Sequence, residues 1–252
     1  HKGAITYHKD YELKKANIYR RAAIRRIDYV LTWIKGDYDA LKRNFITNAK
    51  RLDYIFPNPV NFRMLDKSKP DYSEYDFKSR YGNVILLGNS ADPSNNHMEI
   101  LNYLSNFIDK SFCVILTLSY GNQEYAKSII EIGRELLGNR FIPITEYIEP
   151  RKYCMLLRQV DVGIMNHNRQ QGVGNILALL YLEKKVFMKS TVAPYKLLKE
   201  IGIDIYDERD LLSSTFEELF EFDMSSRSNN RRIIYENFNE ARIKQCADLI
   251  FD

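Results

Sequence analysis

The stretch VILLGNSADPSNNHMEIL, Val84–Leu101, decides the fold of this 252-residue chain. It opens with a run of aliphatic residues typical of a buried strand and ends with apolar residues at helical spacing. Gly88 allows the backbone to turn tightly after the strand, and Ser94 or Asn95 is predicted to cap the helix. A helix cap accounts for one or two polar residues, whereas a bound polar ligand accounts for the rest. Those remaining polar residues are Asn89, Ser90, Asn96 and His97.

The same alternation continues to the end of the chain. Continuous apolar strands that alternate with amphipathic helices are typical of a parallel sheet covered on both faces. Residues 81–252 are therefore predicted to form a doubly wound, Rossmann-like α/β domain. Strands are expected at 83–88, 112–118, 141–144, 161–166, 185–188 and 203–206, and helices at about 95–108, 123–138, 150–159, 174–183, 193–201 and 229–251.

The first 80 residues have a different organisation. They favour a helix at 11–27, a strand at 29–34, a helix at 37–45 capped by Asp37, and a short strand near 53–56. Residues 57–81 hold three prolines and many charges without a clear period, which favours an interdomain linker. Because this block is too short to equal the second, we expect residues 1–80 to be a partial α/β domain with its linker.

The composition indicates a folded protein without a membrane-spanning segment. With 45% hydrophobic residues the chain can bury a core, and no apolar run approaches the roughly 20 residues that cross a bilayer. The first residues contain no apolar signal core, and the three cysteines form no CxxC motif. We therefore expect a cytoplasmic protein with reduced thiols.

Positive charge is concentrated near the start of the chain. Residues 1–80 contain 18 Lys and Arg against 10 Asp and Glu, a net charge of +8, and the remainder has a net charge of −4. The basic residues are densest in KKANIYRRAAIRR, residues 14–26. Such a helix face is attracted to anionic lipid or nucleic acid, or, more often, is simply solvated. The prediction is a peripheral contact with an anionic membrane surface and no nucleic-acid partner.

A second polar loop, HNRQQGVGN, follows the strand DVGIMN and opens the helix NILALLYL. Its glycines allow a ligand to approach the backbone closely, and a helix N-terminus attracts phosphate. The loop is not a Walker motif, because no Gly-Lys-Ser/Thr follows. Two such loops at the carboxyl edge of one sheet favour a phosphate-and-sugar site over ordinary glycine-rich caps. The predicted ligand groups are Arg169 for phosphate, Gln170 and Gln171 for hydroxyls, and Gly172, Gly174 and Asn175 at the helix start.

Two further loops are expected at that edge. Tyr120 and Gly121 end one strand, and TEYIEP, Thr145–Pro150, follows another. Either loop holds a base or sugar, or is simply a turn. The four histidines show no ligand spacing with cysteines or carboxylates, and no HExxH motif or nucleophile elbow occurs. We therefore predict neither a metal ion nor another cofactor.

Three stretches resemble the bacterial 4-alpha-L-fucosyltransferase family: GNSADPSNNH, LSYGNQEY and NHNRQQGVGNILALLYLEKKVF. The resemblance covers about residues 28–210. It implies GT-B architecture, in which two Rossmann-like domains face a cleft, with the acceptor in the first domain and the nucleotide-sugar in the second. The chain would then hold the donor domain and the end of the acceptor domain.

The resemblance also implies an activity: transfer of an N-acetylfucosamine-type sugar from a TDP-sugar to a lipid-linked saccharide. The setting would be cell-envelope polysaccharide synthesis, such as that of enterobacterial common antigen, at the cytoplasmic face of the inner membrane. No catalytic base is assigned, because in this architecture it usually comes from the acceptor domain. The resemblance also implies that Tyr147 and Ile148 bind the base of the nucleotide. The implied donor- and diphosphate-binding residues are Asn89, Ser90, Ser94, Asn95, Asn96, His97, Tyr120, Gly121, Arg169, Gln170, Gln171, Gly172, Gly174 and Asn175.

The chain departs from the family's wider architecture at two places. Many GT-B enzymes place a glutamate on the helix after the second loop to hold the ribose, but here that stretch reads ILALL, which would suit a deoxyribose donor. Glu183 stands where a glycine usually precedes the next strand. Two alternatives stay open: a nucleotide-sugar epimerase of the same fold, and a non-catalytic nucleotide-sugar-binding module.

Overall fold

The computed structural model describes residues 11–55, 60–68 and 76–251. By their internal contacts, residues 1–58 and 238–252 form one unit, and residues 59–237 form another. Part of the predicted linker lies outside the described residues. Its described parts form α3 (Phe62–Lys67) and α4 (Phe77–Tyr81), which both lie in the second unit.

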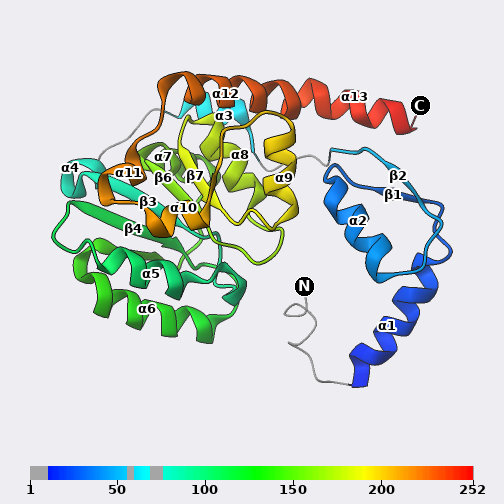
Figure 1. The fold of residues 1–252 in the computed structure, drawn as a ribbon, viewed down its shortest axis with the longest axis horizontal. Helices are drawn as coiled ribbons and strands as arrows, with labels where there is room; N and C mark the ends of the chain where they lie inside the picture. Colours follow the sequence, from blue (N-terminus) through cyan, green and yellow to red (C-terminus); the bar gives the residue numbers. More distant parts are fainter. Residues whose placement is uncertain (1–10, 56–59, 69–75, 252) are drawn as a thin grey trace. The chain divides into compact units, whose positions relative to one another are not determined.

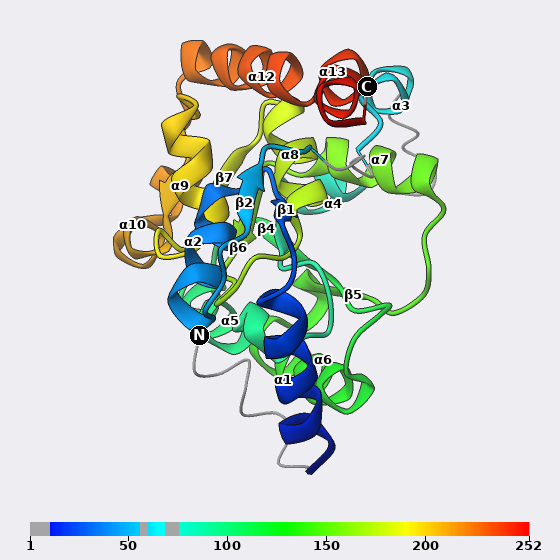
Figure 2. The same cartoon turned by 90° about the vertical axis from the view of Figure 1, so that its right-hand side faces the viewer.

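The first unit contains a two-stranded parallel sheet (Figure 2). Its strands pair in the register Tyr29↔Lys50 to Leu31↔Leu52. The indole of Trp33 meets the ring of Phe238 edge to face at 5.2 Å. The elements of this unit are α1 (Tyr11–Ile24), β1 (Tyr29–Leu31), α2 (Lys35–Asn44), β2 (Lys50–Leu52) and α13 (Glu240–Phe251).

Two local predictions for this unit are wrong. The second strand lies at 50–52 and not near 53–56, because Lys50 N donates to Asp28 O and Thr32 N donates to Leu52 O. Asp37 does not cap α2. The N-cap residue is Ile34, without a side-chain cap bond, and Asp37 lies in the first turn.

The second unit is built on a six-stranded sheet in the order β5-β4-β3-β6-β7-β8 (Figure 1). Every neighbouring pair of strands is parallel. The chain winds outward from β3 to β5 and then crosses to β6 on the other side of β3, so the strand order reverses between β3 and β6. The strands are β3 (Asn83–Leu87), β4 (Phe112–Thr117), β5 (Phe141–Ile144), β6 (Val162–Met165), β7 (Lys185–Met188) and β8 (Tyr206–Asp207).

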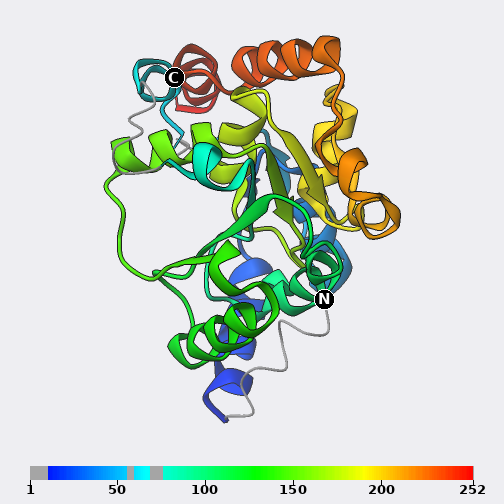
Figure 3. The same cartoon turned by 90° about the vertical axis from the view of Figure 1, so that its left-hand side faces the viewer.

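Helices cover both faces of this sheet. Figures 1 and 3 show α5 and α6 side by side on one face, and α7 and α8 lie on the other. Continuously buried strands such as β4 require this double cover. The remaining helical elements are η2 (Pro93–Asn95), α5 (His97–Ser105), α6 (Gln123–Leu137), η3 (Gly138–Arg140), α7 (Pro150–Gln159), α8 (Val173–Tyr181), α9 (Ala193–Glu200), α10 (Glu208–Ser213), α11 (Phe216–Phe220) and α12 (Met224–Phe238).

The hydrophobic core joins the sheet to α5, α6 and the later helices. Ile85, Leu87 and Leu116 are fully buried in it, and the ring of Phe112 packs 5.6 Å from that of Phe216. The predicted α/β class, with a doubly wound parallel sheet, is confirmed.

Two elements near the C-terminus differ from prediction. The strand expected at 203–206 is only Tyr206–Asp207, because the side chain of Asn230 binds both backbone groups of Asp204 and keeps that residue out of the ladder. The single helix predicted at 229–251 is two helices. Asn239 separates α12 from α13. Its side-chain oxygen accepts from Arg242 N, as the side chain of a helix N-cap residue does.

The structure explains why a glycine is usual at the position that Glu183 occupies in this chain. Its φ is +63°, in the left-handed region that favours glycine. Glu183 N donates to Leu180 O and Lys184 N donates to Leu179 O, which closes the C-terminal end of α8. A glycine at this position avoids the roughly 1 kcal/mol that a side chain costs in that conformation.

Candidate functional site

Two polar loops meet at the point where the strand order reverses. The first loop, residues 88–96, follows β3, and the second loop, residues 166–172, follows the neighbouring strand β6. Ligands of open α/β sheets bind outside the carboxyl ends of the strands at such a point. The predicted polar residues of both loops therefore lie together at one place.

The first loop is held by bonds within itself. Gly88 adopts a φ of +69°, and Asn95 Oδ1 accepts from Asn89 N at 3.1 Å. Asn95 Nδ2 donates to the backbone oxygens of Asp92 and Ser90 at 2.9 and 3.3 Å. The prediction that Ser94 or Asn95 caps the helix is wrong, because the N-cap residue of α5 is Asn96, whose side chain makes no cap bond. Asp92 caps the short helix η2 by accepting from Ser94 N, and this Asp-Pro-Ser turn was the signal that sequence reasoning missed.

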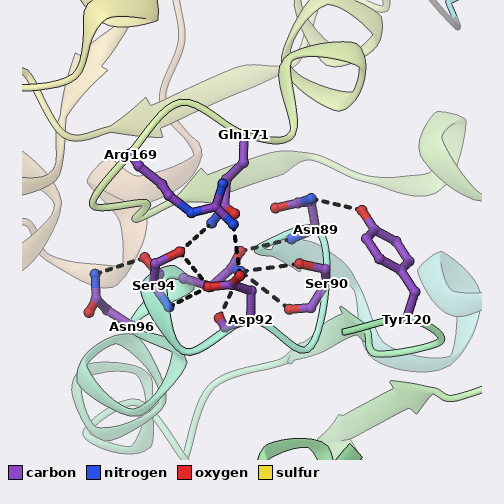
Figure 4. Close-up of polar contacts among 9 residues, drawn as sticks. Asn89, Ser90, Asp92, Ser94, Asn96, Tyr120, Arg169 and Gln171 are labelled. Carbon is purple, nitrogen blue, oxygen red and sulfur yellow. Dashed lines mark hydrogen bonds and ion pairs between the residues drawn. The ribbon is translucent and has the colours of Figure 1, made fainter. Parts of the chain in front are cut away.

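Charged and amide side chains join the two loops (Figure 4). Arg169 Nη2 donates to Asp92 Oδ2 at 2.7 Å, and Gln171 Nε2 donates to Ser94 Oγ at 3.0 Å. Burial alone would raise the pKa of the Asp92 carboxyl, but hydrogen bonds from Ser94 and the charge of Arg169 outweigh it and hold the pKa below its usual value. The pair is therefore ionised, and Arg169 is oriented across the junction.

A second set of contacts extends this junction towards β7. Asn96 Nδ2 donates to Asn166 O at 2.7 Å, and Asn168 Nδ2 donates to Asn96 Oδ1 at 3.1 Å. Lys189, which follows β7, donates to Asn168 Oδ1 at 2.9 Å. Sequence reasoning missed Lys189, since only the sheet order brings the end of β7 beside the second loop.

The N-terminus of α8 lies at the same junction. Gly172 is its N-cap with a φ of +64°, and the first N–H groups of a helix have no partner within the helix. A Cβ on Gly172 would lie 2.9 Å from His167 Cε1 and 3.1 Å from Asn89 Cβ. Glycine therefore allows the helix start, with Gly174 and Asn175, to approach the first loop closely.

The third predicted loop docks on the first. Ala91 N donates to Tyr120 O at 2.8 Å, and Gly121, with a φ of +110°, leaves no room for a side chain beside Ala91. Asn89 Nδ2 donates to the Tyr120 hydroxyl at 2.8 Å, while the Tyr120 residue is 57% exposed (Figure 4). An exposed ring held at its hydroxyl is suited to stack against a planar group.

The fourth loop borders a hollow. A cavity of about 570 Å³ is lined by the end of β5, residues 145–149, the start of α7 and Phe77. Tyr147 and Ile148 are among the lining residues, and Tyr147 is 81% exposed. Leu118 N donates to Ile144 O at 2.7 Å, so this loop and the Tyr120 loop leave neighbouring strands. The two predicted base-binding residues thus line one hollow at the carboxyl edge.

Two predicted ligand residues lie beneath the loops and not at their surface. Asn95 and His97 are fully buried, and direct contact of either side chain with a diphosphate stays a prediction. Asn95 is taken up by the loop backbone, and His97 Nδ1 lies 3.1 Å from the Tyr125 hydroxyl. Burial lowers the pKa of His97 to about 4. Both residues therefore support the first loop from below.

The groups that remain accessible share a chemistry. They are amides, hydroxyls, the Arg169 guanidinium with its Asp92 partner, the Lys189 ammonium and a helix N-terminus, and the cationic and N–H groups suit a polyanion bearing hydroxyl groups. Among the described residues, no group of three His, Cys, Asp or Glu is placed to bind a metal ion. Contact of any of these residues with a ligand stays a prediction. The partly exposed ones are Ser94, Asn96, Arg169, Gln170, Gln171, Gly172, Gly174 and Asn175, whereas Asn89 and Ser90 are buried at the loop's base.

Comparisons with known proteins agree with this architecture. The family model for 4-alpha-L-fucosyltransferase, glycosyl transferase group 56, matches residues 2–219. A glycosyltransferase from Rickettsia africae ESF-5 aligns with a TM-score of 0.68 at 12% identity, over 97% of this chain and 67% of that one. WaaG, a glycosyltransferase involved in lipopolysaccharide biosynthesis, aligns with a TM-score of 0.70 at 9% identity, over 97% and 69%. The chain thus spans about two thirds of these proteins, and the predicted GT-B fold is confirmed.

Proposed function

Because this chain belongs to the 4-alpha-L-fucosyltransferase family of glycosyltransferases, we propose that its carboxyl-edge loops bind a TDP-sugar whose sugar is passed to a lipid-linked saccharide. The proposed sugar is of the N-acetylfucosamine type, and the proposed setting is cell-envelope polysaccharide synthesis. One observation carries the proposal. The first and second loops converge where the strand order reverses, with Arg169 and the N-terminus of α8 at the junction.

The order of the loops along the sheet suggests how the donor lies. The hollow at Tyr147 and Ile148 would take the base, and the exposed ring of Tyr120 stands on the neighbouring strand's loop. The diphosphate would then lie at the α8 N-terminus, and the sugar would extend towards Asn168 and Lys189. The stretch ILALL on α8 offers no carboxylate to a ribose 2′-hydroxyl, which favours a deoxyribose nucleotide.

Sugar transfer needs stabilisation of the negative charge that develops on the leaving diphosphate. Helix N–H groups and a fork-shaped guanidinium supply it without a metal ion. Arg169 already spans the junction and is kept oriented by Asp92, so little reorganisation is needed when the leaving group forms. A proton must also leave the acceptor hydroxyl, and we assign no base for that step.

A thermal-shift panel of TDP, UDP, GDP and ADP tests the donor proposal. TDP should raise the melting temperature, because it binds the native state alone. Arg169→Ala should weaken TDP binding tenfold or more, about 1.4 kcal/mol. Arg134→Ala, an exposed arginine on α6, is the matched control and should leave the TDP shift unchanged. An equal shift in Arg169→Ala would remove that residue from the site, and no shift with any nucleotide would contradict the proposal.

We further propose that the first unit contacts an anionic membrane surface, where a lipid-linked acceptor would reside. On α1, Ile18 and Tyr19 are 67% and 66% exposed beside exposed Arg20 and Arg21, so apolar side chains stand next to basic groups that attract lipid phosphate. Among the described residues no helix is long and apolar enough to cross a membrane.

Vesicle sedimentation tests this contact. The protein should pellet with phosphatidylglycerol-containing vesicles at low salt and be released at high salt, because the attraction is screened. The double variant Arg20→Ala/Arg21→Ala should bind roughly 30-fold more weakly, since each basic residue contributes about 1 kcal/mol near such a surface. Equal binding to neutral vesicles would rule out the electrostatic account.

A further inference from the structure

Two buried histidines lie under the junction of the loops, and the proposed function uses neither. His97 opens α5 and is 0% exposed, and His167 follows β6 and is 1% exposed. In each ring, Nε2 is buried and has no hydrogen-bond partner among the described residues. Leaving such a group unpaired costs free energy, so a polar atom in this position calls for an explanation.

His97 lies against the turn that opens the first loop. Its Nδ1 is 3.1 Å from the hydroxyl of Tyr125 on α6, and the two rings stack at 5.8 Å between centroids. A Cβ on Gly88 would lie only 2.4 Å from His97 Nε2. The unpaired nitrogen therefore faces the backbone at the start of the first loop.

His167 lies against the start of α8. Its ring is hydrogen-bonded to the backbone of Gln171, and a Cβ on Gly172 would lie 2.9 Å from its Cε1. The side chain of Asn89 reaches the same glycine, and Asn89 Oδ1 also has no partner among the described residues. His167 is thus packed between the N-terminus of α8 and the first loop, where the diphosphate is proposed to lie.

The charges around the two rings balance in the free protein. Asp92 favours protonation of both histidines, whereas Arg169, which is paired with Asp92, opposes it at His167, and each protonated ring would repel the other. The Tyr125 phenol lies 3.1 Å from His97 Nδ1, and the Glu99 carboxylate accepts from Asn166. Burial lowers the pKa of His97 to about 4 and that of His167 to about 3. Both rings are therefore neutral at pH 6 to 8.

We propose that His97 and His167 act as a buried pair that takes up a proton when a nucleotide-sugar binds the two loops, so that donor binding is coupled to protonation. The inference rests on the proposed function. A diphosphate at the N-terminus of α8 adds two negative charges beside Gly172, against which His167 packs. A nearby negative charge favours the protonated imidazole, and the vacant Nε2 is where the proton would reside. The pair would then hold a positive charge beneath the diphosphate as positioning residues.

Isothermal titration calorimetry with TDP-glucose tests the coupling. The probe is chosen because its two phosphates keep their charge between pH 5 and 8, unlike the terminal phosphate of TDP. Binding enthalpies are measured at pH 6.0 in two buffers of different ionisation enthalpy. Their difference should show that the protein takes up protons on binding, at most one per ligand. Affinity should correspondingly rise as the pH falls from 7.5 to 5.5, by at most about tenfold per pH unit for one proton.

His167→Asn and His97→Asn identify the group that accepts the proton. Asparagine keeps one nitrogen near the Nδ1 position but cannot titrate, so either variant should reduce the uptake and flatten the pH dependence of the affinity. Binding without proton uptake in the wild-type protein overturns the inference and leaves the proposed function standing. Uptake that both variants retain overturns it too, because other groups would be responsible. Absence of any TDP-glucose binding contradicts the proposed function instead.

A second measurement needs no variant. The imidazole Cε1–H resonances of the wild-type protein can be followed by NMR against pH, with and without saturating TDP-glucose. We expect two histidines that titrate below pH 5 in the free protein, with the pKa of at least one of them rising by about two units or more when the ligand is bound. Unchanged titration of both buried histidines in the saturated protein overturns the inference.

Discussion

Replacing Gly88 with alanine should lower the free energy of unfolding by about 3 kcal/mol. The residue has a φ of +69°, which costs a side chain about 1 kcal/mol. In addition, the new Cβ would lie 2.4 Å from His97 Nε2 and 2.7 Å from Asn95 Oδ1. Neither neighbour can move cheaply, because His97 is stacked on Tyr125 and Asn95 holds the backbone of the first loop. Overpacking of this kind costs a further 1–3 kcal/mol.

Gly202 provides the matched control. Its φ is +88°, also positive, and it closes the C-terminal end of α9, where a Cβ would meet only Ile233 Cδ1 at 3.6 Å, an ordinary contact. Gly202→Ala should therefore cost only the roughly 1 kcal/mol of backbone strain. Chemical denaturation of both variants at pH 7.5 measures the difference. Equal losses of stability would show that the first loop can move away from His97 without cost.

Acidification should destabilise the protein steeply between pH 6.5 and 4.5. The pKa values of His97 and His167 are lowered to about 4 and about 3, whereas histidines in an unfolded chain titrate near 6.5. Across this window the unfolded state therefore binds up to two more protons than the folded state, and stability falls as the pH falls. The histidines together contribute a slope of up to about 2.7 kcal/mol per pH unit.

Two carboxyl groups, those of Glu208 and Asp37, act in the opposite sense, since burial also raises the pKa of Asp37. Burial and the neighbouring Asp207 raise the pKa of Glu208 to about 7, so the folded state binds its proton at a higher pH than the unfolded chain does. Protonation of Glu208 in the folded state therefore raises the free energy of unfolding as the pH falls from 7 to 4.5. This contribution makes the wild-type profile shallower. Glu208→Gln should remove that effect and steepen the acid-induced loss.

Denaturation curves at half-unit steps from pH 7.5 to 4.5 measure this profile. The double variant His97→Asn/His167→Asn should lose most of the slope even if it is less stable at pH 7.5, because asparagine does not titrate. A free energy of unfolding of the Glu208→Gln variant that stays constant from pH 6.5 to 4.5 would contradict the burial of two neutral histidines.

Much of the candidate site was predictable because it depends on where strands end. In a parallel sheet all carboxyl ends share one edge, so polar residues after two strands must face the same side. That argument placed Arg169 and Gln171 with Ser94, and the structure brings them into contact. The same argument could not single out Asp92 among the polar residues of the first loop. The bond between Asp92 and Arg169 joins residues that are 77 positions apart in the sequence.

The sequence by itself determined the alternation of strands and helices, the class of the fold and the loops that meet at the edge. These follow from local hydrophobic periodicity and from the conformations that glycine allows. Only the tertiary structure decided that Asn95 and His97 support the first loop from beneath, that Asn230 shortens β8, and that Lys189 reaches the second loop. The physical reason is that a polar side chain is satisfied by whichever partner the packed chain brings within about 3 Å, and that partner leaves no trace in the local pattern.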